Sequence, residues 1–237
     1  MTYIGSKNRI AKHILPIMLN YAHKRELTTW VEPFVGGGNM IDKVPTHFHR
    51  IGIDYNPHTI EALIAIRDLV HKLPNAISEE QYKQMKGSPP DPITSWVRFV
   101  CSFGRKFEGG YARDKAGYNY AMFAVRSAQK QSPNLQGVQL VHGSYEEYSY
   151  LKNCVIYCDP PYAGTTKYKT GNFDHDKFWD WCRKMSQSNV VFVSEYDAPK
   201  DFLCLWEGEI KTNFSHQRKT AKTATEKLFI HNYVHLL

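Results

Sequence analysis

Most informative about the fold is the stretch Cys154-Val155-Ile156-Tyr157-Cys158-Asp159-Pro160-Pro161-Tyr162. Its first five residues form a short apolar run, which predicts a strand buried inside a sheet. Two prolines then fix the backbone and remove two N–H donors. Because ligands of an open α/β sheet bind beyond the carboxyl ends of its strands, the stretch predicts a chemical site directly after a buried strand, residues 154–158.

The tetrapeptide Asp159-Pro160-Pro161-Tyr162 suits the activation of an exocyclic amine on a nucleobase. Such an amine is a poor nucleophile because its lone pair is delocalised into the ring. The Asp159 carboxylate and the Pro160 carbonyl would each accept one N–H hydrogen bond and orient the nitrogen toward a methyl donor. Tyr162 would stack on a base flipped out of a duplex. The alternative interpretation is an ordinary turn that ends a strand, since the motif is short.

A second junction between a strand and a loop is Val31-Glu32-Pro33-Phe34-Val35-Gly36-Gly37-Gly38. Glycines let a cofactor approach the backbone closely. Asp54 ends the next predicted strand, 18 positions after Gly36, where a carboxylate can accept hydrogen bonds from ribose hydroxyls. The loop lacks the pattern GxGxxG and no phosphate-binding lysine follows it. An adenosyl cofactor is therefore favoured over a dinucleotide or a nucleoside triphosphate.

Outward from these junctions, short β-branched and aromatic runs alternate with helical patterns. This alternation predicts an α/β fold with a mostly parallel sheet covered by helices. The last two strands lack a helix between them, which favours an antiparallel hairpin at the sheet edge. The predicted strands are 29–34, 50–54, 138–142, 154–158, 190–195, 203–210 and 227–234, and the predicted helices are 6–21, 57–72 and 174–185.

Residues 74–137 break this alternation and are interpreted as an inserted lobe, because they are polar and rich in turn residues. Basic side chains suit phosphates and guanine edges, and aromatic rings suit stacking. The candidate DNA-binding residues are Arg105, Lys106, Tyr111, Arg113, Tyr118, Asn119 and Arg126, with Phe107, Lys115 and Tyr120 as further members of the set. A basic segment at 216–222 is a second candidate for phosphate contacts, although a solvated run of charges is the default.

Composition sets the remaining limits. The 237 residues suffice for one α/β domain with an insertion. A net charge of +7 favours a polyanionic partner, with a generic basic surface as the alternative. Five cysteines without a CxxC pair argue against a disulfide scaffold or a paired-thiol zinc site, and Cys154 and Cys158, inside a predicted buried strand, are expected to be core thiols in a reducing compartment. His47 and His49 lack a third ligand, so no metal is predicted. Without an apolar run long enough to span a bilayer, an intracellular protein is expected.

In their order along the chain, the motifs resemble those of the Dam-like (D12 class) DNA adenine-N6 methyltransferases. Residues 3–7 resemble the N-terminal cofactor motif of this family, 32–38 its glycine loop, and 159–162 its catalytic tetrapeptide. Residues 193–197 and 226–233 resemble its late strand motifs. This order, with an insertion between the cofactor half and the catalytic half, is more specific than any single motif.

The resemblance implies a Rossmann-like S-adenosylmethionine-dependent methyltransferase sheet. It implies a catalytic domain of residues 1–73 and 138–237 and a mainly helical target-recognition lobe of residues 74–137. The implied cofactor is S-adenosyl-L-methionine. Its implied contacts are Tyr3, Lys7, Pro33, Phe34, Gly36, Gly38, Asp54 and Asp159. Ser144 stands where family members often carry an acidic residue, so no contact to the cofactor adenine is assigned to it.

The implied reaction is site-specific methylation of adenine N6 in a short sequence of double-stranded DNA, by base flipping and direct transfer. The catalytic residues would be Asp159, Pro160, Pro161 and Tyr162. No cysteine lies in a Pro-Cys motif, which agrees with transfer without a covalent enzyme intermediate. A bacterial or phage-type protein is expected, in a restriction-modification pair or alone, with no membrane and no obligatory protein partner.

Three alternatives stay open. The first is the same chemistry on another amine, such as cytosine N4 in DNA, a guanine in RNA or a protein glutamine. The second is a DNA-binding module that kept the fold and lost catalysis. The third is a nucleotide-dependent oxidoreductase, which would show hydride transfer with NAD(P)H.

Overall fold

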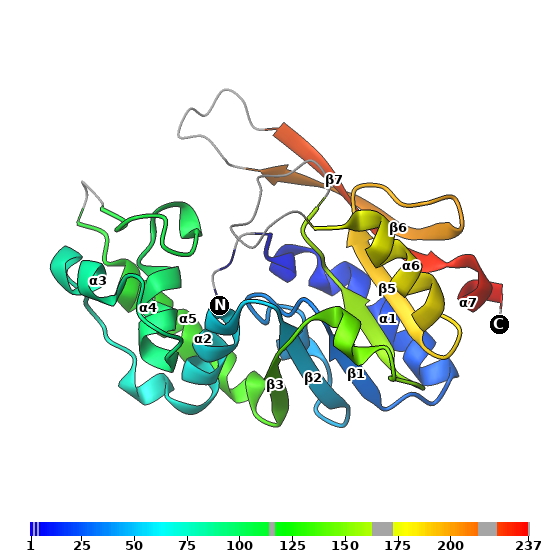
Figure 1. Cartoon of the computed structure of the whole chain (residues 1–237), viewed down its shortest axis with the longest axis horizontal. Coiled ribbons are helices and arrows are strands. Elements are labelled where there is room, and N and C mark those ends of the chain that lie inside the picture. Colours follow the sequence, from blue (N-terminus) through cyan, green and yellow to red (C-terminus); the bar gives the residue numbers. More distant parts are fainter. Residues whose placement is uncertain (2, 4, 114–116, 163–172, 213–221, 237) are drawn as a thin grey trace. The chain divides into compact units, whose positions relative to one another are not determined.

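The computed structural model describes residues 1, 3, 5–113, 117–162, 173–212 and 222–236 (Figure 1). The strands form a mixed seven-stranded sheet, which confirms the predicted α/β, Rossmann-like class. All seven predicted strands are present. They are β1 (Thr29–Glu32), β2 (His49–Asp54), β3 (Val138–His142), β4 (Val155–Cys158), β5 (Val190–Glu195), β6 (Phe202–Thr212) and β7 (Lys222–His231).

Helices connect most of these strands. The α-helices are α1 (Ala11–Lys24), α2 (Pro57–Asp68), α3 (Glu79–Met85), α4 (Pro92–Val100), α5 (Tyr120–Leu135), α6 (His175–Met185) and α7 (Asn232–Leu236). The short 3-10 helices are η1 (Lys7–Arg9), η2 (Ile41–Lys43), η3 (Val70–Lys72), η4 (Phe103–Arg105) and η5 (Tyr145–Tyr148). Three α-helices, α3 to α5, fall within residues 74–137.

Contacts between residues group the chain into two compact units. The first unit contains residues 1–12 and 34–145, and the second contains residues 13–33 and 146–237. Residues 74–137 lie in the first unit together with residues 34–73. The role of residues 74–137 as a separate recognition lobe therefore stays a prediction.

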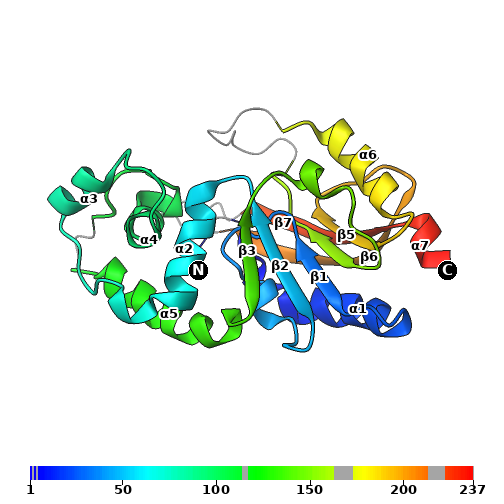
Figure 2. The same ribbon diagram turned by 60° about the horizontal axis from the view of Figure 1, so that its bottom comes forward.

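In the first unit, β2 pairs in parallel with β3 and places Asp54 opposite His142. The helix α2 begins where the sequence predicts, because the Asn56 side chain accepts a hydrogen bond from the His58 backbone N–H at 3.0 Å and Pro57 occupies the first turn. Figures 1 and 2 show α4 and α5 beside α2, and all three helices are in contact.

The carboxyl end of α5 is fastened to β2 by a buried guanidinium. Arg50 is 2% exposed and donates to the Asn134 carbonyl at 2.9 Å and to the Gln136 carbonyl at 2.6 Å. The last carbonyls of a helix have no partner within the helix, so this arginine satisfies them in place of water. The end of α5 is thereby held to the sheet strand that carries Asp54.

The second unit holds the strands in the order β1-β4-β5-β7-β6. Its first three strands are parallel, and β7 is antiparallel to both β5 and β6. The predicted antiparallel hairpin at the sheet edge is thus confirmed. Every residue of β4 and β5 is buried, as expected for strands covered on both faces. Within this unit α6 packs against β5 (Figure 2).

Several predicted boundaries differ from the structure. The predicted strand 227–234 is β7 (Lys222–His231), the predicted strand 203–210 is β6 (Phe202–Thr212), and the predicted helix 57–72 is divided into α2, which ends at Asp68, and η3. The first strand ends at Glu32 and not at Phe34, because Pro33 has no N–H to donate to the ladder. The predicted helix 6–21 is divided into η1 and α1, which continues to Lys24. At this division the Ser6 side chain accepts from the Asn8 backbone N–H, and the single 3-10 turn closes at Ile10.

Cys154 and Cys158 are buried, as predicted for core thiols. Within the described ranges, no helix combines the length and the apolar character that crossing a membrane requires.

Candidate cofactor and catalytic sites

The glycine loop of the first unit is bonded to the carboxylate that ends β2. Asp54 Oδ2 accepts from the Gly36 backbone N–H at 3.0 Å, and Oδ1 accepts from the Asn56 backbone N–H at 2.9 Å. Upstream in the loop, the Val35 N–H donates to the Ile53 carbonyl at 2.8 Å. The sequence predicted that Gly36 and Asp54 belong to one site, and the structure brings them into direct contact.

Burial raises the pKa of Asp54 to about 6. The hydrogen bonds from Asn56 and Gly36 and the nearby His142 oppose this rise in pKa. A carboxylate oxygen can accept two hydrogen bonds, so the backbone donors of Gly36 and Asn56 do not by themselves exhaust the acceptor capacity of Asp54. At neutral pH the ionised form predominates, which is the form that accepts hydroxyl donors.

The loop has no room for side chains at two of its glycines. A Cβ on Gly37 would lie 2.7 Å from the Tyr3 Cβ and 2.8 Å from the Met1 carbonyl oxygen. A Cβ on Gly36 would lie 3.1 Å from the Tyr3 ring, and Gly36 has a φ of +49°. Tyr3 in turn packs on Phe99, with 5.6 Å between ring centroids. The predicted cofactor residue Tyr3 therefore lies against the predicted glycine loop.

For three other predicted cofactor residues, no contact with the glycines of the loop is described, and their surroundings are as follows. Lys7 is only 5% exposed, and its Nζ donates to the Gly5 carbonyl at 3.0 Å. Phe34 packs on Tyr145, with 5.4 Å between centroids. Pro33 is buried in the second unit directly after β1.

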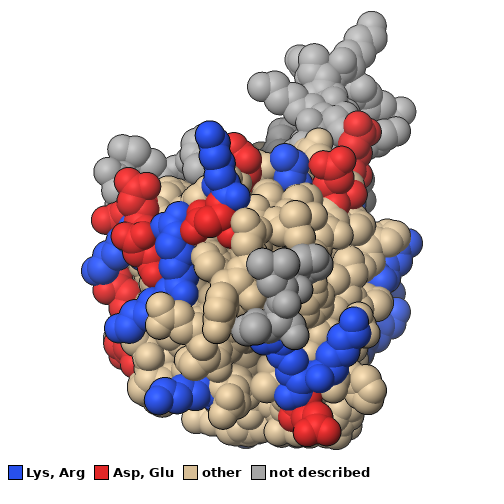
Figure 3. All heavy atoms as spheres, turned by 90° about the vertical axis from the view of Figure 1, so that its right-hand side faces the viewer, with Lys and Arg blue, Asp and Glu red and all other residues tan. Residues whose placement is uncertain are grey.

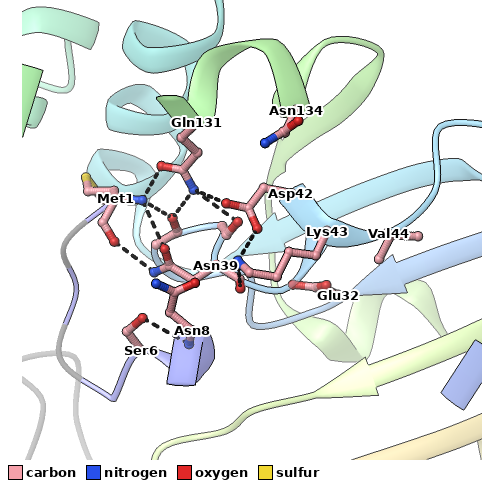
Figure 4. A network of polar contacts seen from close by, with 12 residues as sticks. Met1, Ser6, Asn8, Glu32, Asn39, Asp42, Lys43, Val44, Gln131 and Asn134 are labelled. Atoms are coloured by element: carbon pink, nitrogen blue, oxygen red, sulfur yellow. Dashed lines mark hydrogen bonds and ion pairs between the residues drawn. The ribbon is translucent and has the colours of Figure 1, made fainter. Parts of the chain in front are cut away.

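Gln131 of α5 forms hydrogen bonds with the backbone of the glycine loop, and sequence reasoning missed this residue. Its Nε2 donates to the carbonyls of Gly37 at 3.0 Å and Gly38 at 3.1 Å, and to Asp42 Oδ2 at 3.0 Å. Figure 4 shows this amide pointing from α5 into the loop. A glutamine in a polar helical stretch carries no signal for such a role, because only the fold brings α5 to the loop.

In the second unit, Asp159-Pro160-Pro161-Tyr162 follows the buried strand β4, as predicted. The Tyr162 hydroxyl donates to Glu226 Oε2 at 2.5 Å. Tyr196 packs edge-on against the Tyr162 ring, with 4.6 Å between centroids. Burial and the charges of Asp159 and Glu226 raise the pKa of Tyr162 well above its usual range, so this hydroxyl stays protonated.

Other carboxylates accompany the tetrapeptide. Because β1, β4 and β5 are parallel, their carboxyl ends share one edge of the sheet, where Glu32 and Glu195 end β1 and β5. Both are buried, and Glu32 accepts from the Trp30 indole N–H at 2.9 Å. The Tyr157 hydroxyl of β4 and the Ser194 hydroxyl of β5 lie 2.8 Å apart. The strand that precedes the tetrapeptide is thus hydrogen-bonded to β5 through side chains as well as through the backbone.

Two candidate DNA-binding residues near the start of α5, Tyr118 and Tyr120, form an aromatic cluster together with Phe123, which sequence reasoning did not single out. Tyr118 stacks on Phe123 with centroids 4.3 Å apart and meets Tyr120 edge-on at 4.8 Å. All three rings are exposed, and the Arg126 guanidinium lies 5.6 Å above the Phe123 ring. Asn119 caps α5 by accepting from the Met122 backbone N–H at 3.0 Å.

The other candidate DNA-binding residues differ in their exposure and in their partners. The Tyr111 hydroxyl donates to the Ile77 carbonyl at 2.7 Å, and the exposed Arg113 pairs with Glu79. A pocket of about 410 Å³ lies between them and the aromatic cluster, lined by Tyr111, Arg113, Tyr118, Asn119 and Tyr120 among others. Lys106 is exposed. The Arg105 side chain, Lys115, residues 216–221 and the Lys222 side chain lie outside the described part of the chain.

The net charge of +7 is not collected into one patch on the face seen in Figure 3. Lys and Arg side chains are interspersed there with Asp and Glu, and uncharged atoms fill much of the area.

Comparison with known families supports the predicted class. Residues 3–91 match the family model of the D12 class N6 adenine-specific DNA methyltransferases. The predicted resemblance to this family is confirmed over this part of the chain, and adenine-specific DNA methylation with S-adenosylmethionine is the chemistry of that class.

A more particular similarity is to the type II methyltransferase M.FokI of Planomicrobium okeanokoites. The two sequences are 22% identical over 211 residues, which is 77% of this chain. The chain spans about a third of the length of this relative, 31%.

Solved structures with a similar course of the chain include a proposed RNA methyltransferase from Pyrococcus horikoshii and a proposed methylase from Haemophilus influenzae. The first has a TM-score of 0.46 at 12% identity and covers 97% of this chain and 86% of its own. The second has a TM-score of 0.40 at 10% identity and covers 94% and 88%.

Proposed function

We propose that this protein is a DNA methyltransferase that transfers a methyl group from S-adenosylmethionine to N6 of adenine within a short duplex sequence. The observation that carries the proposal is the tetrapeptide Asp159–Tyr162, which follows a buried parallel strand in a chain whose residues 3–91 match the D12 class. The rigid surroundings of Tyr162 support the assignment of the tetrapeptide to catalysis rather than to an ordinary turn.

The residues of the first unit fit an adenosyl cofactor. Asp54 retains acceptor capacity for the ribose hydroxyls. The glycines at 36 and 37 let the loop backbone pack closely against Tyr3 and Met1, and a ligand would approach the loop from a side that these residues leave open. When bound, S-adenosylmethionine would supply an electrophilic methyl group on a sulfonium. Tyr3 and Phe34, both half-buried in this unit, are the aromatic candidates for its apolar parts.

The residues of the second unit would prepare the amine. The carboxylate of Asp159 and the Pro160 carbonyl would accept the two amino hydrogens of adenine, which turns the nitrogen lone pair toward the methyl donor. Tyr162, fixed by Glu226 and Tyr196, would stack on the flipped base. The attacking nitrogen would then lose a proton to solvent or to Asp159. No side chain of the enzyme would form a covalent bond to the base.

The segment 74–137 would supply the recognition of DNA. The exposed aromatic cluster with Arg126 combines stacking surface and positive charge, which are the features that nucleic-acid contacts use. Arg113 and Lys106 are also exposed. The same chemistry on cytosine N4 is the second candidate, because the tetrapeptide acts on an exocyclic amine in both cases.

The test is product analysis. The protein is incubated with labelled S-adenosylmethionine and duplex DNA of mixed sequence, the DNA is digested to nucleosides, and the modified positions are mapped by sequencing. N6-methyladenine at one short sequence is expected. N4-methylcytosine would replace the proposed base with the second candidate, and absence of any labelled nucleoside would overturn the proposal.

A further inference from the structure

The helix α5 connects two places that the proposed function assigns to different ligands. Its first residues belong to the exposed aromatic cluster, and Gln131 near its end bonds to the glycine loop. From Tyr120 to Gln131 the helix rises about 17 Å as one continuous element. Rigid secondary elements are one route by which energetic coupling is carried between two sites, and α5 is such an element between these two places.

The contact between α5 and the glycine loop has several independent parts. The Gln131 amide donates to the Gly37 and Gly38 carbonyls and to the Asp42 carboxylate. A Cβ on Gly38 would meet Gln131 Nε2 at 3.4 Å and Leu135 at 3.6 Å, so the helix also packs directly on the loop. Gln131 is 6% exposed, so water cannot readily replace it.

Both polar groups of the Gln131 side-chain amide have hydrogen-bond partners. Its Oε1 accepts from the backbone nitrogen of Met1, which also donates to the Gly37 carbonyl at 2.6 Å (Figure 4). An apolar side chain at position 131 would remove the Nε2 donor from three oxygen atoms and the acceptor from the Met1 nitrogen. The Gly37 and Gly38 carbonyls would keep donors from Met1 and from the Asp42 backbone N–H, so the expected loss is the direct link between α5 and the loop.

We propose that Gln131 is a positioning residue for the cofactor loop, and that through it DNA bound at the start of α5 and cofactor bound at the loop strengthen each other. This inference rests on the proposed function, since it requires both ligands. Coupling between two binding sites is reciprocal, so the same factor must appear whichever ligand is titrated.

The experiment measures the affinity of S-adenosylhomocysteine by calorimetry, with and without a duplex carrying the sequence that the wild-type protein methylates. The wild-type protein is expected to bind at least about fivefold more tightly when the duplex is present. Gln131→Leu should bind about tenfold more weakly without DNA, which corresponds to about 1.4 kcal/mol, and should lose most of the enhancement by DNA.

Two variants on the same helix serve as controls. Gln129→Leu makes the same chemical change at an exposed position, and it should keep both the affinity and the enhancement. Val125→Ala removes buried methyl groups and lowers the melting temperature, so it reports what destabilisation alone does. The proposal is overturned if Gln131→Leu keeps the wild-type enhancement, or if Val125→Ala loses it equally.

Hydrogen exchange on the wild-type protein gives a second test that needs no variant to fold. Binding of S-adenosylhomocysteine should slow exchange in α5 as well as in residues 34–42, and duplex binding should slow exchange in residues 34–42. Protection confined to each ligand's own surface would overturn the inference. Failure of the proposed function is distinguishable, because the wild-type protein would then bind no S-adenosylhomocysteine or methylate no DNA.

Discussion

The glycine loop and the Asp159–Tyr162 tetrapeptide both follow sheet strands, yet they are held in different ways. The loop is held through its own backbone, by Asp54 on one side and Gln131 on another. The tetrapeptide is held through a side chain, because the Tyr162 ring is fixed by Glu226 and Tyr196. The loop should therefore be sensitive to added volume, and the tetrapeptide to lost functional groups.

The largest effect should come from Asp159→Ala. In the proposed mechanism the carboxylate accepts a hydrogen bond from the amine during attack, and loss of one such electrostatic partner costs about 10²- to 10³-fold in turnover. Methyl transfer from labelled S-adenosylmethionine measures it, while a thermal melt and a DNA-binding assay verify that the variant is folded. Turnover at the wild-type rate would remove Asp159 from catalysis.

The second-largest effect is expected when a methyl group is added to the glycine loop. In Gly37→Ala the new Cβ would be too close to the Tyr3 Cβ and the Met1 carbonyl, so the loop must shift. Such overpacking costs about 1 to 3 kcal/mol, or about 5- to 150-fold in cofactor affinity if the shift is borne by the loop. Calorimetry with S-adenosylhomocysteine measures it. If Gly37→Ala binds S-adenosylhomocysteine with wild-type affinity, the loop can accommodate the added methyl group without a change at the cofactor site.

The pH dependence of cofactor binding sharpens the comparison, since Asp54, which is bonded to the glycine loop, has a pKa of about 6. Ribose hydroxyls donate to the ionised form, so affinity should be constant well above pH 6 and fall as pH decreases through 6. At pH 5 about a tenth of Asp54 remains ionised, and affinity should be about tenfold lower than at pH 7.5. Asp54→Asn should bind weakly without this pH dependence. An equal dependence in the variant would assign it to another group.

Removal of the Tyr162 hydroxyl should have a smaller effect. Tyr162→Phe keeps the ring for stacking and deletes the hydrogen bond to the Glu226 carboxylate, a kind of bond that contributes about 1.5 to 3 kcal/mol to stability. Because the ring stays in place, only part of this free energy should be lost in the transition state, and the kcat should fall about tenfold. Glu226→Gln retains an acceptor oxygen and should be milder than Glu226→Ala. If Tyr162→Phe equals wild type while Tyr162→Ala is inactive, stacking alone explains the residue.

The smallest effect on the fold should come from Arg113→Ala. The pair of Arg113 with Glu79 is exposed, and such pairs contribute about 0 to 1 kcal/mol. Melting temperature should change little, whereas DNA binding should weaken and its salt slope should fall by about 1 if the residue contacts a phosphate. Fluorescence anisotropy at several salt concentrations measures this slope, and an unaltered slope would exclude that contact.

Local patterns were sufficient to predict much of this molecule. Apolar runs predicted the buried strands β4 and β5. The spacing from Gly36 to Asp54 predicted that both belong to one cofactor site, and the structure places the Gly36 N–H 3.0 Å from the Asp54 carboxylate, while the cofactor contact stays a prediction. Sequence reasoning missed Gln131, because its role depends on where α5 lies relative to a loop more than 90 positions away. The role of Glu226 was also missed, although its motif was recognised, since strand pairing decides which side chains face Tyr162.

Under the proposed function, in which residues 74–137 recognise DNA, the bonds between α5 and the rest of the first unit limit how the recognised sequence could be altered. Exchanging the whole segment 74–137 for that of a relative would also exchange Gln131 and the carbonyls that Arg50 binds, and the hybrid would have to rebuild both. A graft confined to residues 117–126 would change the aromatic cluster and leave those contacts in place. Such a graft, rather than exchange of the segment, is the more economical route to a methyltransferase with a new target sequence.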